Sequence, residues 1–227
     1  MRKVMKLGLL LCAGAVAMLA LVGCKQLDVV GSQSVTSFDA VLKAIPDKVR
    51  AEELNYGWSL SAPDDTARFI WSEDYSKSPL YDVMLELDAQ PFLDAGLDPN
   101  KLPENVLQYE NKLMVGTKLG SDALKYSGEV TPLAAYEQIV NLYRDSIGYH
   151  TALDHYGVKL TNGNMFEWAK DMSKNDKDIV FVLNPEPFIA AGVDPNAVEG
   201  WAFAKVPMEE DGKAIEVEKL LKPFDLQ

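Results

Sequence analysis

The decapeptide PFLDAGLDPN at residues 91–100 recurs as PFIAAGVDPN at residues 187–196. Seven of the ten positions are identical, and two of the other three are exchanges between aliphatic residues. The first proline of each copy, Pro91 or Pro187, suits the first turn of a helix, because its missing N–H would have no partner there. Gly96 and Gly192 suit the left-handed C-cap, a conformation that glycine adopts most readily. The motif therefore predicts a short helix and a sharp corner, present twice.

The repetition extends beyond the decapeptides. One apolar stripe with helical spacing is followed by a second one at a constant separation of 98 residues: Phe38, Val41, Leu42, Ile45 and Val49, then Tyr136, Ile139, Val140, Tyr143 and Ile147. Ser37 and Thr131 stand where the N-caps of these helices are expected. Later segments match at separations of 96 to 100 residues. The pattern predicts a tandem duplication, with a first repeat at 37–125 and a second at 126–227.

Both repeats predict one order of elements. A long helix, regular over 132–149 in the second copy, precedes three β-rich segments, the short helix and one or two further strands. No long crossover helix separates consecutive strands, which favours antiparallel pairing. The expected fold class is α+β: a tandem duplication of a unit of helix, three strands, short helix and one or two strands. Its mainly antiparallel sheets are expected to be related by a pseudo-twofold axis.

The N-terminus has the pattern of an export signal. Basic residues Arg2, Lys3 and Lys6 precede an uncharged apolar run over 7–23, which is short for a complete membrane span. The run ends in Leu21-Val22-Gly23-Cys24, which resembles the bacterial lipobox. This resemblance implies a signal peptide at 1–23 and a lipoprotein anchored by acyl chains, such as palmitate, on Cys24.

Residues 24–36 are expected to be the lipidated cysteine and a tether, because KQLDVVGSQSVT at 25–36 is polar and rich in small residues. Lys25 is not the aspartate that retains enterobacterial lipoproteins at the inner membrane. By that resemblance, the protein is expected on the periplasmic side of the outer membrane in a Gram-negative host. In a Gram-positive host the anchor would hold it on the outer face of the cytoplasmic membrane.

Charge and cysteine content restrict the possible partners. Of the two cysteines, Cys12 lies in the expected signal peptide, so the mature chain would have no intramolecular disulfide. Removal of 1–23 takes away three basic residues and changes the formal net charge from −12 to −15. So acidic a chain repels nucleic acid and anionic headgroups, and the lipid is expected to make the membrane contact.

Signatures of catalysis are absent from the sequence. It contains no G-x-S-x-G, H-E-x-x-H, P-loop or glycine-rich dinucleotide turn. We therefore assign no catalytic residue and expect no cofactor, although a metal-dependent activity stays open.

The only histidines, His150 and His155, offer one candidate metal site together with Asp154. At the end of the second long helix, the two imidazoles would point about 140° apart unless the chain bends after His150. The simpler interpretation is a pair of histidines that complement the C-terminal end of the helix dipole.

Trp71 and Trp168 recur at matching strand positions, followed three residues later by Asp74 and Asp171. With Tyr156, they could form a ligand-binding platform of aromatic rings and carboxylates. The alternative, which the duplication favours, is a pair of core anchors with carboxylates that cap turns.

The expected function is that of a non-catalytic, lipid-anchored cell-envelope protein. It would bind a partner protein or small ligand at or near the seam, the contact surface between the two repeats. A structural or assembly lipoprotein without a small ligand is one alternative. A metal-dependent hydrolase that uses the histidine pair is the other.

Overall fold

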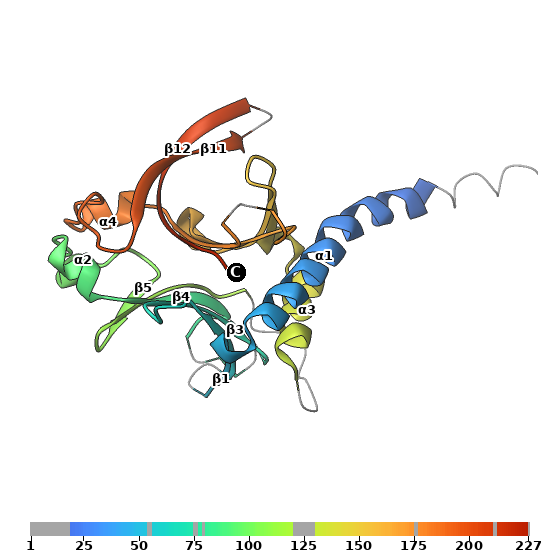
Figure 1. Cartoon of the computed structure of the whole chain (residues 1–227), viewed down its shortest axis with the longest axis horizontal. Coiled ribbons are helices and arrows are strands. Elements are labelled where there is room, and N and C mark those ends of the chain that lie inside the picture. Colours follow the sequence, from blue (N-terminus) through green and yellow to red (C-terminus); the bar gives the residue numbers. More distant parts are fainter. Residues whose placement is uncertain are drawn as a thin grey trace, which may run out of the picture.

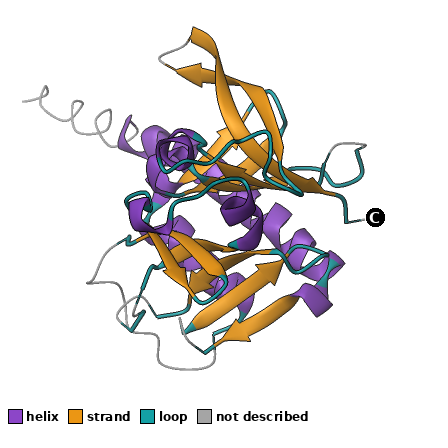
Figure 2. Cartoon of the chain, turned by 90° about the vertical axis from the view of Figure 1, so that its left-hand side faces the viewer, coloured by secondary structure: helices purple, strands orange, loops and turns teal. Residues whose placement is uncertain are grey.

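The computed structural model describes residues 19–53, 56–74, 77–78, 80–119, 130–174, 177–210 and 213–226, without the side chains of 19–28, 209 and 210. Two six-stranded antiparallel sheets face each other, and helices cover the two ends of the space between them (Figure 1 and Figure 2). The cores of the two sheets meet in one cluster of buried apolar side chains.

The first sheet is built from the N-terminal half and has the strand order β1-β2-β3-β4-β6-β5. The elements of this half are α1 (Leu19–Ala44), η1 (Pro46–Lys48), β1 (Val49–Glu52), β2 (Gly57–Ser61), β3 (Ala67–Ser72), β4 (Val83–Asp88), α2 (Gln90–Asp94), η2 (Pro99–Lys101), β5 (Val106–Tyr109) and β6 (Lys112–Thr117).

The second sheet has the order β11-β12-β10-β9-β8-β7, which is the same arrangement read from its other edge. The elements of this half are α3 (Pro132–Leu142), η3 (Arg144–Ser146), β7 (Ile147–His150), β8 (His155–Lys159), η4 (Thr161–Gly163), β9 (Met165–Ala169), β10 (Ile179–Leu183), α4 (Glu186–Ala190), β11 (Ala202–Glu210) and β12 (Lys213–Phe224).

The α+β class and the antiparallel sheets are confirmed. The expected unit had three strands before the short helix, which is one fewer than the structure has. Four strands precede the short helix in each half, because β1 and β7 pair with β2 and β8. The expected helix over 132–149 was wrong beyond Leu142, where α3 ends. Ile147 and Tyr149 favour a strand, and Gly148 weakens a helix. The segment after α3 therefore forms β7 and pairs with β8.

Helix α1 starts well before Ser37, its expected N-cap, and the segment that we expected to be a tether is helical. Ser34 and Ser37 donate their hydroxyls to carbonyls one turn earlier, at 2.8 and 3.0 Å, which satisfies these groups inside a helix. The side chains of the second half also bind this segment: Tyr136 donates to Ser34 Oγ at 3.0 Å and Tyr156 to Gln33 Oε1 at 2.6 Å. Tertiary contacts thus outweigh the low helix propensity of the segment.

Each long helix packs against the sheet of the other half. Helix α1 contacts β7 and β9, and α3 contacts β2 and β3. Two indole hydrogen bonds repeat the exchange: Trp71 donates to the carbonyl of Pro132 at 3.0 Å, and Trp168 donates to Ser37 Oγ at 2.8 Å. Each half therefore supplies a helix that completes the core of the other.

The two decapeptides meet at the opposite end from α1 and α3, where α2 and α4 lie close together (Figure 1). The N–H groups of Asp98 and Asp194 donate to the carbonyls of Ala191 and Ala95, both at 2.8 Å. Gly96 and Gly192 have φ of +104° and +102°, and a Cβ on either would stand 2.7 Å from the carbonyl oxygen of the other. Glycine is required here for the turn and for the close approach of the two corners.

The second sheet curls more than the first. Strands β11 and β12 arch away from the space between the sheets (Figure 1). A hydrogen bond joins the edge strand β11 to the opposite edge strand β7. In that bond His150 Nε2 donates to the carbonyl of Pro207 at 2.8 Å. The outer face of this sheet is consequently concave. Within the described residues, none of the helices combines the length and apolar character needed to cross a membrane.

Candidate functional site

The two tryptophans proposed for a ligand platform are core residues. Trp71 and Trp168 are both fully buried, and Phe38 contacts both rings, with centroid distances of 5.4 and 5.0 Å. Neither indole has a face open to a ligand, so the expected stacking platform is not formed. The reason is the exchange of helices, which places α1 and α3 over these rings.

The associated polar residues are also engaged in local structure. Asp74 pairs with Lys77 at 3.1 Å, and Asp171 accepts bonds from the hydroxyl and the amide of Ser173 at 2.6 and 3.0 Å. These two bonds hold the pKa of Asp171 below its ordinary value. Tyr156 points inward to α1, where it binds Gln33. The three residues do not converge on one site.

Aromatic rings fill the space between the two sheets at the seam. Phe69 and Phe166 stack across it, with centroids 4.3 Å apart and planes within 1°. A cavity of about 760 Å³ lies at the edge of the seam, between α1, α3 and β7. Glu137, Arg144 and Asp145 line it, but they are exposed, so water already solvates these charges.

The histidine pair lies on a hairpin and not at a helix end. His150 on β7 is directly opposite His155 on β8, which places both side chains on the concave outer face of the second sheet. The sequence left open either a divergence of about 140° on a continued helix or a bend after His150; the chain turns after His150 to form the hairpin. The register of the hairpin brings together two imidazoles that the helical periodicity separated.

Glu167 on β9 completes this cluster. His150 Nδ1 lies 3.5 Å from Glu167 Oε1, and His155 Nδ1 lies 3.7 Å from Glu167 Oε2. Burial opposes the ionisation of Glu167, yet its contacts with the two histidines keep its pKa below the ordinary value. The contact with Glu167 raises the pKa of His150 despite desolvation, and the bond to Pro207 acts in the same direction. Glu167 and His150 thus stabilise each other as an ion pair.

Buried polar atoms of the cluster remain without hydrogen bonds. Both ring nitrogens of His155 and the Oε2 atom of Glu167 lack a partner, although these residues are only 2% and 3% exposed. At 3.7 Å, the contact between His155 and Glu167 is too long to count as a hydrogen bond. Leaving a buried polar group unsatisfied costs about 1–3 kcal/mol, so these atoms mark a site suited to a polar ligand group.

A cavity of about 340 Å³ opens beside the cluster; we call it the concave cavity. Its walls are mainly apolar and come from β9, β10, β11, β12 and the β7–β8 turn: Ala152, Leu153, Met165, Val180, Val182, Val206, Met208, Leu221 and Pro223. The polar residues at its lining are His150, His155, Glu167, Asp154, Lys177 and Lys219. An apolar pocket with a few buried polar groups is the usual form of a small-molecule site.

Asp154, proposed as a third metal ligand, is engaged outside the cluster. It accepts a hydrogen bond from Tyr149 and pairs with Lys174 at 2.6 Å, and these partners keep its pKa low. Across the part of the chain that the structure describes, no group of three or more His, Cys, Asp or Glu side chains has an arrangement that could hold a metal ion.

The sequence interpretation missed Glu167 and Lys219. Glu167 pairs with Val180 in the register in which Ile70 pairs with Met84, so a carboxylate occupies the counterpart of a buried isoleucine. Comparison of the two repeats could have identified it, because a charge that replaces a buried apolar residue needs an explanation.

Comparison with known proteins gives no further assignment: the chain matches no protein-family model, no curated protein and no solved structure.

Proposed function

We propose that this protein is a non-catalytic, lipid-anchored component of the cell envelope that binds a small ligand in the concave cavity. The observation that carries the proposal is the apolar cavity beside His155 and Glu167, whose buried polar atoms have no hydrogen-bond partner. The proposed binding site therefore moves from the seam to the outer face of the second repeat.

The membrane anchor follows from the lipobox. Cys24 would carry the acyl chains; it lies in α1, outside the residues whose side chains are described. Helix α1 would then extend toward the anchor and hold the folded part close to the membrane, at the outer membrane in a Gram-negative host. Metabolic labelling with an alkynyl palmitate tests this, since labelling should disappear in Cys24→Ala and persist in Cys12→Ala.

We also propose that the two halves arose by tandem duplication and are related by a pseudo-twofold axis. Two relationships support this: the paired bonds from Asp98 to Ala191 and from Asp194 to Ala95, and the exchange of α1 and α3 between the sheets. In both, a contact from one half is returned by the equivalent residues of the other, as in a twofold interface.

The ligand-binding proposal is tested by thermal unfolding of the full chain in lipid nanodiscs. Sugars, peptidoglycan fragments, single-chain lipids, peptides and divalent metals would be screened, with chelator controls. A ligand at a hundred times its dissociation constant adds about 2.7 kcal/mol of stability. Val182→Phe, which fills the concave cavity, should abolish the shift, whereas Leu107→Phe, on exposed β5, should leave it unchanged.

A shift that survives Val182→Phe would place the ligand elsewhere and overturn the cavity proposal. If no class of ligand shifts the unfolding midpoint, a structural or assembly lipoprotein becomes the better interpretation.

A metal-dependent hydrolase is the weaker second candidate: His150 and His155 converge on Glu167, but the described side chains have no arrangement that could hold a metal ion. A rise in the midpoint with Zn²⁺ that chelator reverses, and that His155→Ala removes, would support it. Without that rise the candidate fails, since hydrolysis through this cluster would require a bound metal.

A further inference from the structure

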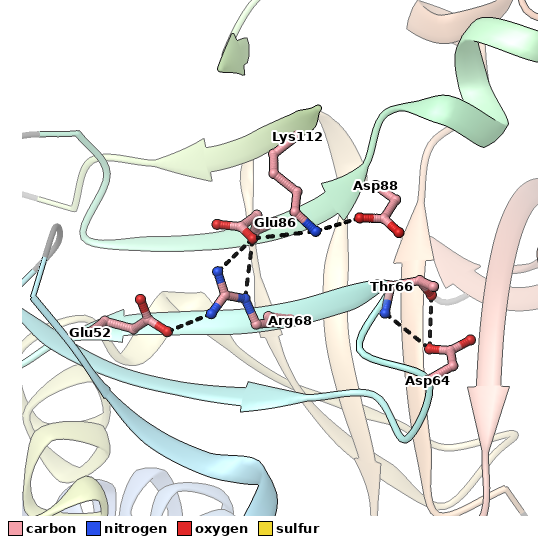
Figure 3. A network of polar contacts seen from close by, with 7 residues as sticks. All are labelled: Glu52, Asp64, Thr66, Arg68, Glu86, Asp88 and Lys112. Atoms are coloured by element: carbon pink, nitrogen blue, oxygen red, sulfur yellow. Dashed lines mark hydrogen bonds and ion pairs between the residues drawn. The ribbon is translucent and has the colours of Figure 1, made fainter. Parts of the chain in front are cut away.

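The outer faces of the two sheets differ in how their charges are compensated. On the first sheet, Arg68 binds Glu86 at 2.6 Å and Glu52 at 2.8 Å, and Lys112 contacts Asp88 (Figure 3). Every cation of this network has a carboxylate partner. Partnered charges of this kind need no ligand.

The strand registers identify the equivalent positions on the second sheet. Arg68 pairs with Glu86 where Met165 pairs with Val182. Lys112 and Lys219 stand directly before Leu113 and Leu220, which pair with equivalent residues of β4 and β10. The second sheet has therefore kept the lysine and replaced the arginine–glutamate pair with apolar side chains.

Asp88, the direct partner of Lys112, is also replaced. The equivalent residue, one position after Leu183, is Asn184, which carries no charge. Among the described residues no carboxylate lies within ion-pair distance, 4.0 Å, of Lys219 Nζ. Within the described part of the chain, Lys219 donates one hydrogen bond, to the carbonyl of Gly163 at 2.9 Å.

Lys219 lines the concave cavity and is only 6% exposed. Desolvation lowers its pKa, and the more distant charges of Glu167 and Glu186 oppose this effect only in part. A buried ammonium with one neutral acceptor lacks most of the compensation that burial requires. An anionic group entering the cavity would supply it.

Each of the other charged residues of the cavity lies within 4.0 Å of a side chain that is or can become oppositely charged. Glu167 faces His150 and His155, Asp154 binds Lys174, and Lys177 binds Asp225 at 2.6 Å. Among the described residues that line the cavity, Lys219 is thus the charged one without an oppositely charged neighbour within 4.0 Å. The remaining walls are aliphatic and thioether side chains.

We propose that the concave cavity binds a single-chain amphiphile with a carboxylate head, such as a medium-chain fatty acid, and that Lys219 receives the carboxylate. This inference rests on the proposed function and names the ligand class of the same site. The apolar walls would hold the acyl chain, and the ammonium would donate a charge-assisted hydrogen bond to the head. A volume of about 340 Å³ is at the lower end of ligand pockets, which fits one chain and not a two-chain lipid.

The test uses the full chain in nanodiscs, with empty nanodiscs as the reference for partitioning. Decanoate and decan-1-ol, each labelled with ¹³C at C1, would be titrated and their saturable binding followed by NMR. The two probes have the same chain and differ in the charge of the head. Decanoate should bind more tightly than decanol, and Val182→Phe should abolish saturable binding of both.

The variants separate the head group from the chain. Lys219→Met should weaken decanoate binding roughly tenfold to a hundredfold, as expected for the loss of a charge-assisted hydrogen bond, and should leave decanol binding unchanged. Lys112→Met, the matched change on the first sheet, should affect neither probe. Lys219→Arg keeps the cation and should retain decanoate binding, which guards against a folding defect in the methionine variant.

The outcomes distinguish this inference from the proposed function. Equal binding of decanoate and decanol, unaffected by Lys219→Met, would overturn the role of Lys219. Absence of binding by both probes, while another ligand class raises the midpoint in a manner sensitive to Val182→Phe, would overturn the ligand class and leave the proposed function standing. Failure of every class would overturn both.

Discussion

The indole N–H of Trp168 donates a hydrogen bond to Ser37 Oγ, which lies 131 positions earlier in the chain. The bond joins the second sheet to a helix of the first half, and Trp71 makes the equivalent bond to Pro132 in α3. The two tryptophans therefore report on the docking of α1 and α3, and they provide ways to test the fold.

We expect Ser37→Ala to destabilise the protein by about 1–3 kcal/mol, because the buried Trp168 N–H loses its acceptor. Thr36→Ala is the matched control: this exposed hydroxyl binds only a carbonyl one turn earlier, so its loss should have little effect. Urea unfolding measures both. Equal stability of the two variants would contradict the contribution assigned to the indole bond.

The exchange of helices predicts that neither half folds alone. Residues 1–125 and 126–227, expressed separately, should show no cooperative unfolding, since each lacks the helix that covers its sheet. Mixed together, they should recover the near-ultraviolet circular dichroism of the intact chain. A cooperative thermal transition in either isolated half would contradict this prediction.

The approach of Gly96 to Gly192 predicts a large effect from one methyl group. Gly96→Ala forces alanine into a left-handed conformation and places its Cβ against a backbone carbonyl, so we expect a loss of about 2–4 kcal/mol. Gly200 also has positive φ, but a Cβ there would be 3.4 Å from Nζ of Lys222, an ordinary van der Waals distance, and not against a backbone carbonyl. Gly200→Ala should therefore cost only the conformational part, about 1–2 kcal/mol. Similar losses would show that the contact between the corners is unimportant.

The ion pair of His150 and Glu167 predicts how stability varies with pH. The pKa of His150 is raised above its ordinary 6.5, so its contribution is complete below that pH and is lost as the pH rises through the folded value. The pKa of Glu167 is lowered below 4.5, so its contribution is present above that pH and is lost as the pH falls through the folded value. This pair should stabilise the fold most between pH 4.5 and 6.5.

Urea unfolding from pH 5.5 to 8.5 checks the alkaline limb, where histidine is the side chain that ordinarily titrates. The free energy of unfolding should fall with rising pH, and His150→Gln should reduce the slope. Tyr149→Phe, the neighbour on β7, keeps both histidines and should preserve it. An unchanged slope in His150→Gln would refute the assignment.

Lys219 predicts a conflict between stability and binding. Without ligand, Lys219→Met should leave stability unchanged or raise it by about 1 kcal/mol, because a desolvated charge is replaced by an apolar chain of similar length. Lys112→Met should lower stability, since it leaves Asp88 without its cation. Differential scanning calorimetry of both variants provides the measurement. A marked destabilisation by Lys219→Met would mean that its bond to Gly163 outweighs the cost of burial.

Much of the fold was predictable because the sequence contains similar segments in its two halves. The constant spacing between the stripes of Phe38 and Tyr136 predicted the two long helices, and the decapeptides predicted α2 and α4 with their corners. The predicted end of a helix was wrong where an apolar residue fits both the helical and the strand pattern. Ile147 continues the helical stripe of α3, yet it begins β7.

The site was less predictable because strand pairing assembles it. Helical spacing separated His150 from His155, whereas the hairpin places them opposite each other. Glu167 and Lys219 come from β9 and β12, and no local motif joins them. Lys219 lacks the carboxylate partner that Lys112 has on the first sheet. This difference became visible when the two lysines were compared in the structure.

The bond between His150 and Pro207 has a consequence for self-association. Edge strands display unpaired N–H and C=O groups, to which another chain can add a strand. Pro207 has no N–H to offer, and its carbonyl is already taken by His150. At this point β11 presents neither a donor nor an acceptor. On the membrane to which we propose that this protein is anchored, it would be locally concentrated, and such a position would interrupt the strand addition that leads to aggregation.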